Sequence, residues 1–266
     1  MSIRTRSTVP AWLWVPAAAG LLFSAGPLAA LLANVPWTDM GSVLASGPTR
    51  TALGLSLGTS LASTLLCVLL GLPLAVLFSR LGGPGIQLLR GILLVPLVLS
   101  PVVSGIALLY FWGRQGLVGR FLDAAGLGVG YTPAAVVIVQ VFVSLPFFVV
   151  AAHASLREVD PELELAAATS GAGPTAILRH ITLPLALPGI VSGALLAFAR
   201  SLGEYGATIT FAGSIEGRTR TLPLQIELSL NSSQPQLALG ICLLLISLYL
   251  ALLVLARVGA GRLLPR

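Results

Sequence analysis

Long apolar stretches alternate with short polar segments along almost the whole chain. An α-helix needs about 20 apolar residues to cross the hydrocarbon core of a bilayer. Six stretches reach this length, at about 12–33, 51–78, 91–112, 133–155, 183–205 and 237–256. The pattern therefore predicts an all-α polytopic membrane protein with about six transmembrane helices, built as a single transmembrane domain over residues 1–266.

Glycine and proline inside these stretches predict how the helices pack and bend. Two glycine pairs are spaced four residues apart, Gly54 with Gly58 and Gly189 with Gly193, and such faces allow helix backbones to approach closely. Four prolines remove helical hydrogen bonds, so kinks are expected at Pro73, Pro96, Pro101 and Pro146. Packing of a helix bundle explains all of these residues without any transport role.

The first apolar stretch follows Arg4 and Arg6, as the core of a signal peptide would. Its 22 residues exceed the usual core of about 7–15, and no clear small-x-small cleavage site follows it. We interpret it as a retained first span.

Composition supports a membrane protein, and the charge distribution gives a predicted topology. The 266 residues are 56% hydrophobic and 9% charged, with a mean hydropathy of +0.97 and a net charge of +6. All basic residues are arginines, scattered singly or in pairs between spans without interleaved aromatics, which argues against nucleic-acid binding. If both termini are cytoplasmic, the cytoplasmic segments contain nine arginines and the outer segments contain five. The inner ones are Arg4, Arg6, Arg80, Arg90, Arg157, Arg179, Arg257, Arg262 and Arg266, and the outer ones are Arg50, Arg114, Arg120, Arg218 and Arg220. This positive-inside bias places the segment 156–182 in the cytoplasm.

Candidate catalytic and metal-binding residues are sparse. Cys67 and Cys242 both lie in apolar spans without a partner at metal spacing, so we interpret them as buried thiols. None of the nine acidic residues forms a pair with acid–base or metal spacing inside a span, and His153 and His180 have no nucleophile beside them. No nucleotide-binding glycine motif occurs either. The sequence therefore predicts no enzyme, no metal and no cofactor.

The segment 156–182 has the signals of a helix, a turn and a second helix. Asp160 is a favourable N-cap, Pro161 suits the first helical position, and Glu162 and Glu164 favour the positive end of the helix dipole. These signals predict a short helix over 161–170. A break follows at Gly171 and at Gly173 with Pro174, after which a second helix leads into the span beginning near Leu183.

This segment resembles the cytoplasmic "EAA" loop of bacterial ABC-importer permeases. The pattern of two alanines, a glycine and a distal I-x-L-P is matched at Ala166, Ala167, Gly171, Ile181, Leu183 and Pro184. One departure is Leu165, which stands where the acidic residue usually precedes the alanines, with Glu164 one position earlier, as in the oxyanion branch. The resemblance implies a type I ABC-importer permease fold in which the helix at about 161–171 couples to an ATPase subunit.

The end of the fifth stretch carries an acid and a base at membrane depth, where charges are costly and often functional. At about 1.5 Å per residue from Leu183, Arg200 lies about 25 Å along this helix, and Glu204 is four residues further on. One interpretation is a structural pair on one helix face. The other is an outer gate for an anion, in which Gly203 and Gly206 permit close backbone approach.

The run from Ala199 to Leu224 is similar to the molybdate branch of the sulfate/molybdate permeases. This resemblance implies an ATP-driven molybdate importer of the bacterial cytoplasmic membrane. Its expected partners are a second copy of the chain, two ABC ATPase subunits, an external substrate-binding protein, an oxyanion and the lipid bilayer. Sulfate or tungstate remains open as the substrate, because all three are tetrahedral dianions.

A second class, an ion-coupled secondary transporter, also remains open. Its spans would offer Gln140, His153 and several hydroxyls for coupling, but no central carboxylate. Uptake that survives ATP depletion and collapses with the ion gradient would support this alternative.

Overall fold

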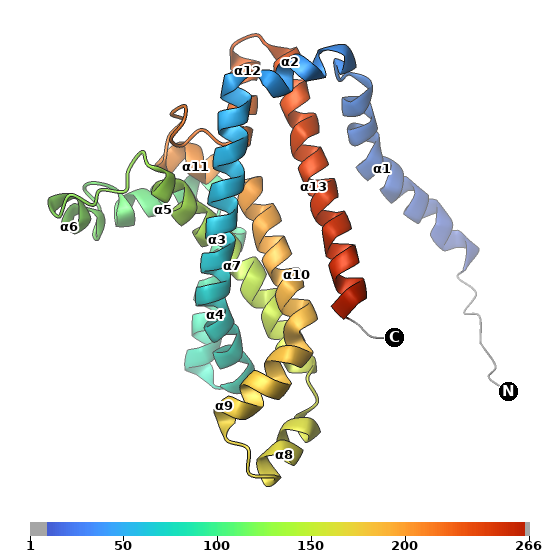
Figure 1. The fold of residues 1–266 in the computed structure, drawn as a ribbon, viewed down its shortest axis with the longest axis vertical. Coiled ribbons are helices and arrows are strands. Elements are labelled where there is room, and N and C mark those ends of the chain that lie inside the picture. Colours follow the sequence, from blue (N-terminus) through green and yellow to red (C-terminus); the bar gives the residue numbers. More distant parts are fainter. Residues whose placement is uncertain (1–9, 264–266) are drawn as a thin grey trace.

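The computed structural model describes residues 10–263, and these residues form helices and loops with no strand (Figure 1). Arg4, Arg6 and Arg266, three of the arginines used in the topology prediction, lie outside the described residues. The long helices are α1 (Trp14–Ala33), α3 (Gly47–Arg80), α4 (Pro84–Val98), α5 (Pro101–Trp112), α7 (Pro133–Glu158), α10 (Leu183–Leu202) and α13 (Pro235–Leu263). Short helices connect them: α2 (Met40–Ala45), α6 (Gly119–Ala124), α8 (Pro161–Thr169), α9 (Pro174–Ile177), α11 (Gly206–Phe211) and α12 (Leu222–Asn231).

Three helices, α3, α7 and α10, form the core of the molecule. They share a cluster of buried side chains that includes Phe78, Phe148, Ala152 and Ala186. Figure 1 shows these helices running along the long axis, with α8 at one end of the bundle and α12 at the other. These two ends are called the α8 end and the α12 end below.

Within residues 10–263, five helices are long and apolar enough to cross a membrane: Trp14–Ala33, Gly47–Arg80, Pro133–Glu158, Pro174–Leu202 and Pro235–Leu255. These helices coincide with five of the six predicted spans, with ends that differ by several residues. The fifth helix stops at Leu202, short of the predicted end at residue 205, because the chain turns before α11. Most of the other differences are extensions, and α3 continues to Arg80.

The stretch predicted as one span over 91–112 is not a single straight helix, and it gives a sixth span only when its two bent helices are counted together. This region belongs to two helices, α4 and α5, which are bent by 119° at Leu99 and Ser100. The cause is Pro101, which disfavours helical backbone at the preceding residue and has no N–H to continue the ladder. Ser100 is extended, with a ψ of 148°, and its hydroxyl accepts a hydrogen bond from the Val103 N–H to begin α5. The predicted kink sites Pro73, Pro96 and Pro146, by contrast, lie inside helices that continue through them.

The two predicted glycine faces have opposite surroundings. A Cβ on Gly189 would collide with Ser155, and one on Gly193 would lie 3.1 Å from the Phe148 carbonyl oxygen, so α10 packs tightly on α7 there. A Cβ on Gly54 or Gly58 would meet nothing within 4 Å. Among residues 10–263, no other part of the chain makes the close approach predicted at Gly54 and Gly58.

Helix α1 stands apart from the bundle, as Figure 1 shows. None of the residues in α1 is buried by the rest of the described chain. Its apolar surface is left for lipid or for another chain.

Candidate functional site

The α8 end carries the predicted coupling helix, and local capping explains its bounds. The Asp160 carboxylate accepts a hydrogen bond from the Glu162 N–H at 2.9 Å, which confirms the predicted N-cap. The helix ends in a Schellman motif, in which the N–H groups of Gly171 and Ala172 bond back to the carbonyls of Ala168 and Ala167, both at 3.0 Å. Gly171 has a φ of +88°, a conformation that glycine adopts without strain.

The Glu164 carboxylate connects α8 to two other helices of the bundle, α3 and α10. Glu164 forms a bidentate ion pair with Arg80 at the end of α3. It also accepts a hydrogen bond from the Thr182 hydroxyl at 2.6 Å, and Thr182 lies directly before α10. Arg80 reaches Thr182 as well, at 3.2 Å. Glu164 therefore connects α8 to the end of α3 and to the residue before α10.

Charge at Glu164 is stabilised by this arrangement. The hydrogen bond from Arg80 is the largest influence and lowers the pKa of the carboxyl below its ordinary value of 4.5; partial burial opposes this shift and Thr182 assists it. Glu164 is consequently ionised at neutral pH, and the Arg80 pair holds over the whole neutral range.

The remaining residues of the coupling motif lie around this contact. Glu162 and Ala166 are exposed and Ala167 is half-buried, while Leu163 and Leu165 expose apolar side chains. Beyond the turn, α9 passes into α10 through a single π-helical turn, Leu178–Thr182, which contains Ile181. Leu183 is half-buried and Pro184 is exposed at the start of α10. A helix with exposed apolar residues at the end of a membrane bundle is suited to bind another protein.

The predicted charge pair lies at the α12 end of α10. Arg200 Nη1 is 2.6 Å from Glu204 Oε2, and the Glu204 side chain is 2% exposed against 30% for Arg200. The structural pair is therefore present, but not on one helix face, because α10 ends at Leu202 and Glu204 occupies the turn that follows. From this turn its second oxygen accepts a hydrogen bond from the Ala207 N–H at 2.9 Å, at the start of α11.

Gly203 and Gly206 flank this turn and make close approaches within the chain. A Cβ on Gly203 would lie 2.5 Å from the Tyr249 hydroxyl of α13, and one on Gly206 would lie 2.5 Å from Pro101 Cβ of α5. The turn that carries Glu204 is thus held between α5 and α13.

A group of buried polar side chains adjoins this turn and includes Gln140, a coupling candidate of the sequence analysis, together with three serines that were not named there. The Ser201 hydroxyl bonds those of Ser63 and Ser144 at 2.8 and 2.9 Å, and Gln140 donates to the Ser201 carbonyl at 3.1 Å. These bonds connect α3, α7 and α10 in the buried interior of the bundle. Hydrogen bonds of this kind hold membrane helices in register.

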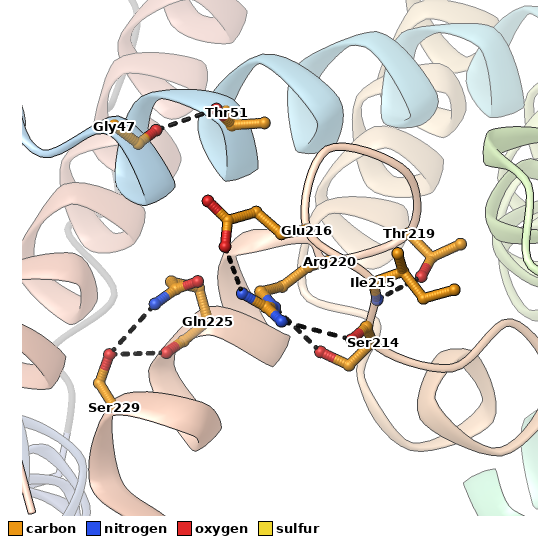
Figure 2. Close-up of polar contacts among 9 residues, drawn as sticks. All are labelled: Gly47, Thr51, Ser214, Ile215, Glu216, Thr219, Arg220, Gln225 and Ser229. Atoms are coloured by element: carbon orange, nitrogen blue, oxygen red, sulfur yellow. Dashed lines mark hydrogen bonds and ion pairs between the residues drawn. The ribbon is translucent and has the colours of Figure 1, made fainter. Parts of the chain in front are cut away.

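The loop between α11 and α12 is also ordered by polar contacts, which Figure 2 shows. Arg220 donates to Glu216 at 3.1 Å and to the Ser214 hydroxyl at 3.2 Å, and the Thr219 hydroxyl accepts from the Ile215 N–H at 2.8 Å. Arg218 is exposed at the tip of this loop. These contacts were not predicted from the sequence, although the spacing of Glu216 and Arg220 by four residues was a signal.

This arrangement of apolar helices, with a tethered surface helix at one end and a buried charge pair at the other, defines a polytopic membrane permease. Residues 67–266 match the model of the family described as the binding-protein-dependent transport system inner membrane component. The chain belongs to this family, whose members are components of ABC transport systems.

Relatives and solved structures agree with this assignment. The chain is 51% identical over 217 residues to the molybdenum transport system permease protein ModB of Mycobacterium tuberculosis, covering 82% of each chain. It is 46% identical over 169 residues to ModB of Escherichia coli K12, covering 62% of this chain and 74% of that one. A bacterial alginate ABC transporter shares the fold with a TM-score of 0.74 at 17% identity, over 94% of this chain and 93% of that one. The MetNI methionine ABC transporter also shares the fold, with a TM-score of 0.64 at 18% identity over 83% of this chain and 100% of that one.

Proposed function

We propose that the chain is the permease subunit of an ATP-driven importer of molybdate across the bacterial cytoplasmic membrane. The molybdenum permeases named above support the substrate, because their similarity covers most of this chain. Tungstate and sulfate have the same charge and tetrahedral shape, and they are the competing substrates in the test below. ATP hydrolysis belongs to partner subunits in this proposal.

The observation that carries the coupling mechanism is the shared contact of Glu164 with Arg80 and Thr182. An ATPase subunit that binds α8 and moves on ATP binding would displace Glu164, and with it the ends of α3 and α10. Helix α10 then transmits the motion to Arg200 and Glu204, about 25 Å away at 1.5 Å per residue. In this proposal these two residues and their flanking glycines, Gly203 and Gly206, form the gate, which offers a releasable positive charge to the anion.

The orientation follows from the same proposal. The α8 end faces the cytoplasm, where the ATPases lie, and the loop with Arg220 faces the external binding protein. Both chain termini are then cytoplasmic, and residues 1–266 form one transmembrane domain.

Two copies of the chain form the transport pathway in this proposal, each with its own ATPase. The unburied helix α1 and the open face at Gly54 and Gly58 support a second copy, since both are apolar surfaces that the described chain leaves uncovered. The proposed complex therefore contains two permeases, two ATPases and one binding protein.

Reconstitution of this complex tests the function directly. Permease, ATPase and binding protein are placed in proteoliposomes, and ATP hydrolysis is measured with molybdate, tungstate or sulfate bound to the binding protein. Molybdate is expected to stimulate hydrolysis and to accumulate inside. Stimulation by sulfate alone would refute the substrate, and uptake that follows an ion gradient without ATP would refute the class.

The role of α8 is tested separately with Ala166→Arg. Ala166 is exposed on α8, so the new side chain leaves the fold intact but blocks a surface that binds another protein. The matched control is Ala125→Arg, an exposed position after α6. Copurification of the ATPase is expected to fail only for Ala166→Arg, and equal ATPase recovery with both variants would contradict docking at α8.

A further inference from the structure

Two adjoining cavities lie at the α8 end of the bundle, between α3, α4 and α7. The first has a volume of about 480 Å³ and is basic, since its lining includes Arg80, Arg90 and Arg157 against one carboxylate, Glu164. The second, about 220 Å³, shares Phe78 and Arg90 with the first; its other lining residues are Leu93, Leu94, Val149, Val150 and His153. One cavity is therefore polar and positively charged, and its neighbour is mainly apolar.

The positive charge of the first cavity is only partly neutralised. Glu164 pairs with Arg80, which leaves two guanidinium groups without a carboxylate partner among the described residues. Arg90 donates through Nη2 to the Phe78 carbonyl, while its Nε is buried and has no hydrogen-bond partner there. Arg157 is exposed and makes no hydrogen bond or ion pair within residues 10–263. Each guanidinium has five N–H donors, so the cavity contains N–H donors that no described residue accepts.

Backbone amides add to this field. Helix α4 begins at the cavity, after Gly83, and no side chain caps its first turn. Gly83, Ile86 and Gln87 all line the cavity, so the start of a 15-residue helix faces it. Free N–H groups at a helix start attract anions, particularly phosphate.

The depth of each cavity along the bundle distinguishes a free oxyanion from an anionic phospholipid as the ligand. Phe78 lies two residues before the end of α3, and Arg90 lies about 9 Å into α4 at 1.5 Å per residue. Leu93, Leu94 and Val150 continue from Arg90 toward the middle of the bundle, and Val150 is half exposed on its outside. A free oxyanion would occupy only the basic cavity, whereas an anionic phospholipid would occupy both.

We propose that these cavities bind one anionic phospholipid, with the headgroup phosphate beside Arg90 and Arg157 and the glycerol and upper acyl chains in the apolar cavity. Basic pockets between membrane helices bind anionic headgroups in this way. The lipid would lie next to Arg80, and hence next to the contact that holds α8. This site does not depend on which ion is transported.

Native mass spectrometry of the full-length chain in a neutral detergent tests the proposal. Phosphatidylglycerol and phosphatidylcholine with identical acyl chains are titrated separately, and phosphatidylglycerol is expected to bind more tightly. Arg157→Gln should weaken phosphatidylglycerol binding about fivefold, the factor that corresponds to about 1 kcal/mol per arginine. Its matched control is Arg179→Gln, which removes the same charge from an exposed residue outside both cavities and should change nothing.

A second variant separates a lipid from a free anion. Val150→Trp fills the apolar cavity and removes no arginine, so it should abolish selective lipid binding. Inorganic phosphate at equal ionic strength should not displace the lipid. Unchanged lipid binding by Val150→Trp, or complete displacement by phosphate, would show that the site takes a free anion and refute the proposal. Equal binding of both lipids, or equal effects of Arg157→Gln and Arg179→Gln, would also refute it.

Discussion

The contact between α7 and α10 makes a sharp prediction about Gly189. In the structure a Cβ at this position would lie 2.5 Å from the Ser155 hydroxyl oxygen and would collide with Ser155 Cβ. Gly189→Ala must therefore push α10 away from α7, or shift Ser155, whose hydroxyl donates to the Ala186 carbonyl at 3.2 Å. Gly54→Ala is the matched control, because the same methyl group at that position meets nothing within 4 Å.

The expected magnitude follows from two opposing effects. An alanine in a helix is favoured over glycine by up to about 1 kcal/mol, and both variants gain this amount. Forcing an extra methyl group into a packed interior costs about 1–3 kcal/mol, and only Gly189→Ala has this cost. The free energy of unfolding of Gly189→Ala should thus be about 1–3 kcal/mol below that of Gly54→Ala. At roughly 2–4 °C for each kcal/mol in a chain of this size, the two melting temperatures should differ measurably.

Thermal unfolding of both variants in one detergent measures this difference, and two double variants test its cause. Ser155→Gly removes the Cβ that collides and should restore much of the stability of Gly189→Ala. Ser155→Ala keeps that Cβ and should restore much less. Equal melting temperatures for Gly189→Ala and Gly54→Ala, or equal rescue by both changes at Ser155, would refute the packing argument.

Three further predictions concern the polar contacts. Glu164→Gln should lower stability by about 1 kcal/mol at neutral pH. Folding lowers the pKa of Glu164, so its stabilisation is present above pH 4.5 and is lost as the pH falls through the lowered pKa. The melting temperatures of this variant and of the natural chain should therefore converge at that low pH. Glu204→Gln should cost roughly 1–3 kcal/mol, measured by thermal unfolding, because buried Glu204 would lose its charge opposite Arg200; no loss would contradict the pairing. Arg220→Ala should speed hydrogen exchange in loop 212–221, whereas Arg218→Ala, at an exposed position, should not; equal exchange in both would contradict the role of Arg220.

Sequence reasoning was most accurate where the signals are local. Helix α8 was predicted within one residue, because Asp160, Pro161 and Gly171 specify its ends through bonds to neighbouring residues. It was less accurate at the third span. Pro101 indicated a kink, but hydropathy carries no information about an angle, and the 119° bend was missed.

Contacts between distant parts of the chain were not predictable in the same way. Arg80 and Glu164 are 84 residues apart, and Arg80 had been counted only as an inner charge. The two glycine faces were identical as motifs, yet one is packed against α7 and the other is open. His153 was a candidate coupling residue, and the structure places it beside Arg90 in the apolar cavity.

The sequence by itself determined the membrane class, the positions of five apolar helices and the form of the coupling helix, since these depend on hydropathy and on interactions between near neighbours. Only the tertiary structure decided which charges meet, which glycines are packed and where two cavities adjoin. The physical reason is that an ion pair or a close helix contact depends on positions set by the whole bundle, which residue spacing along one helix does not encode.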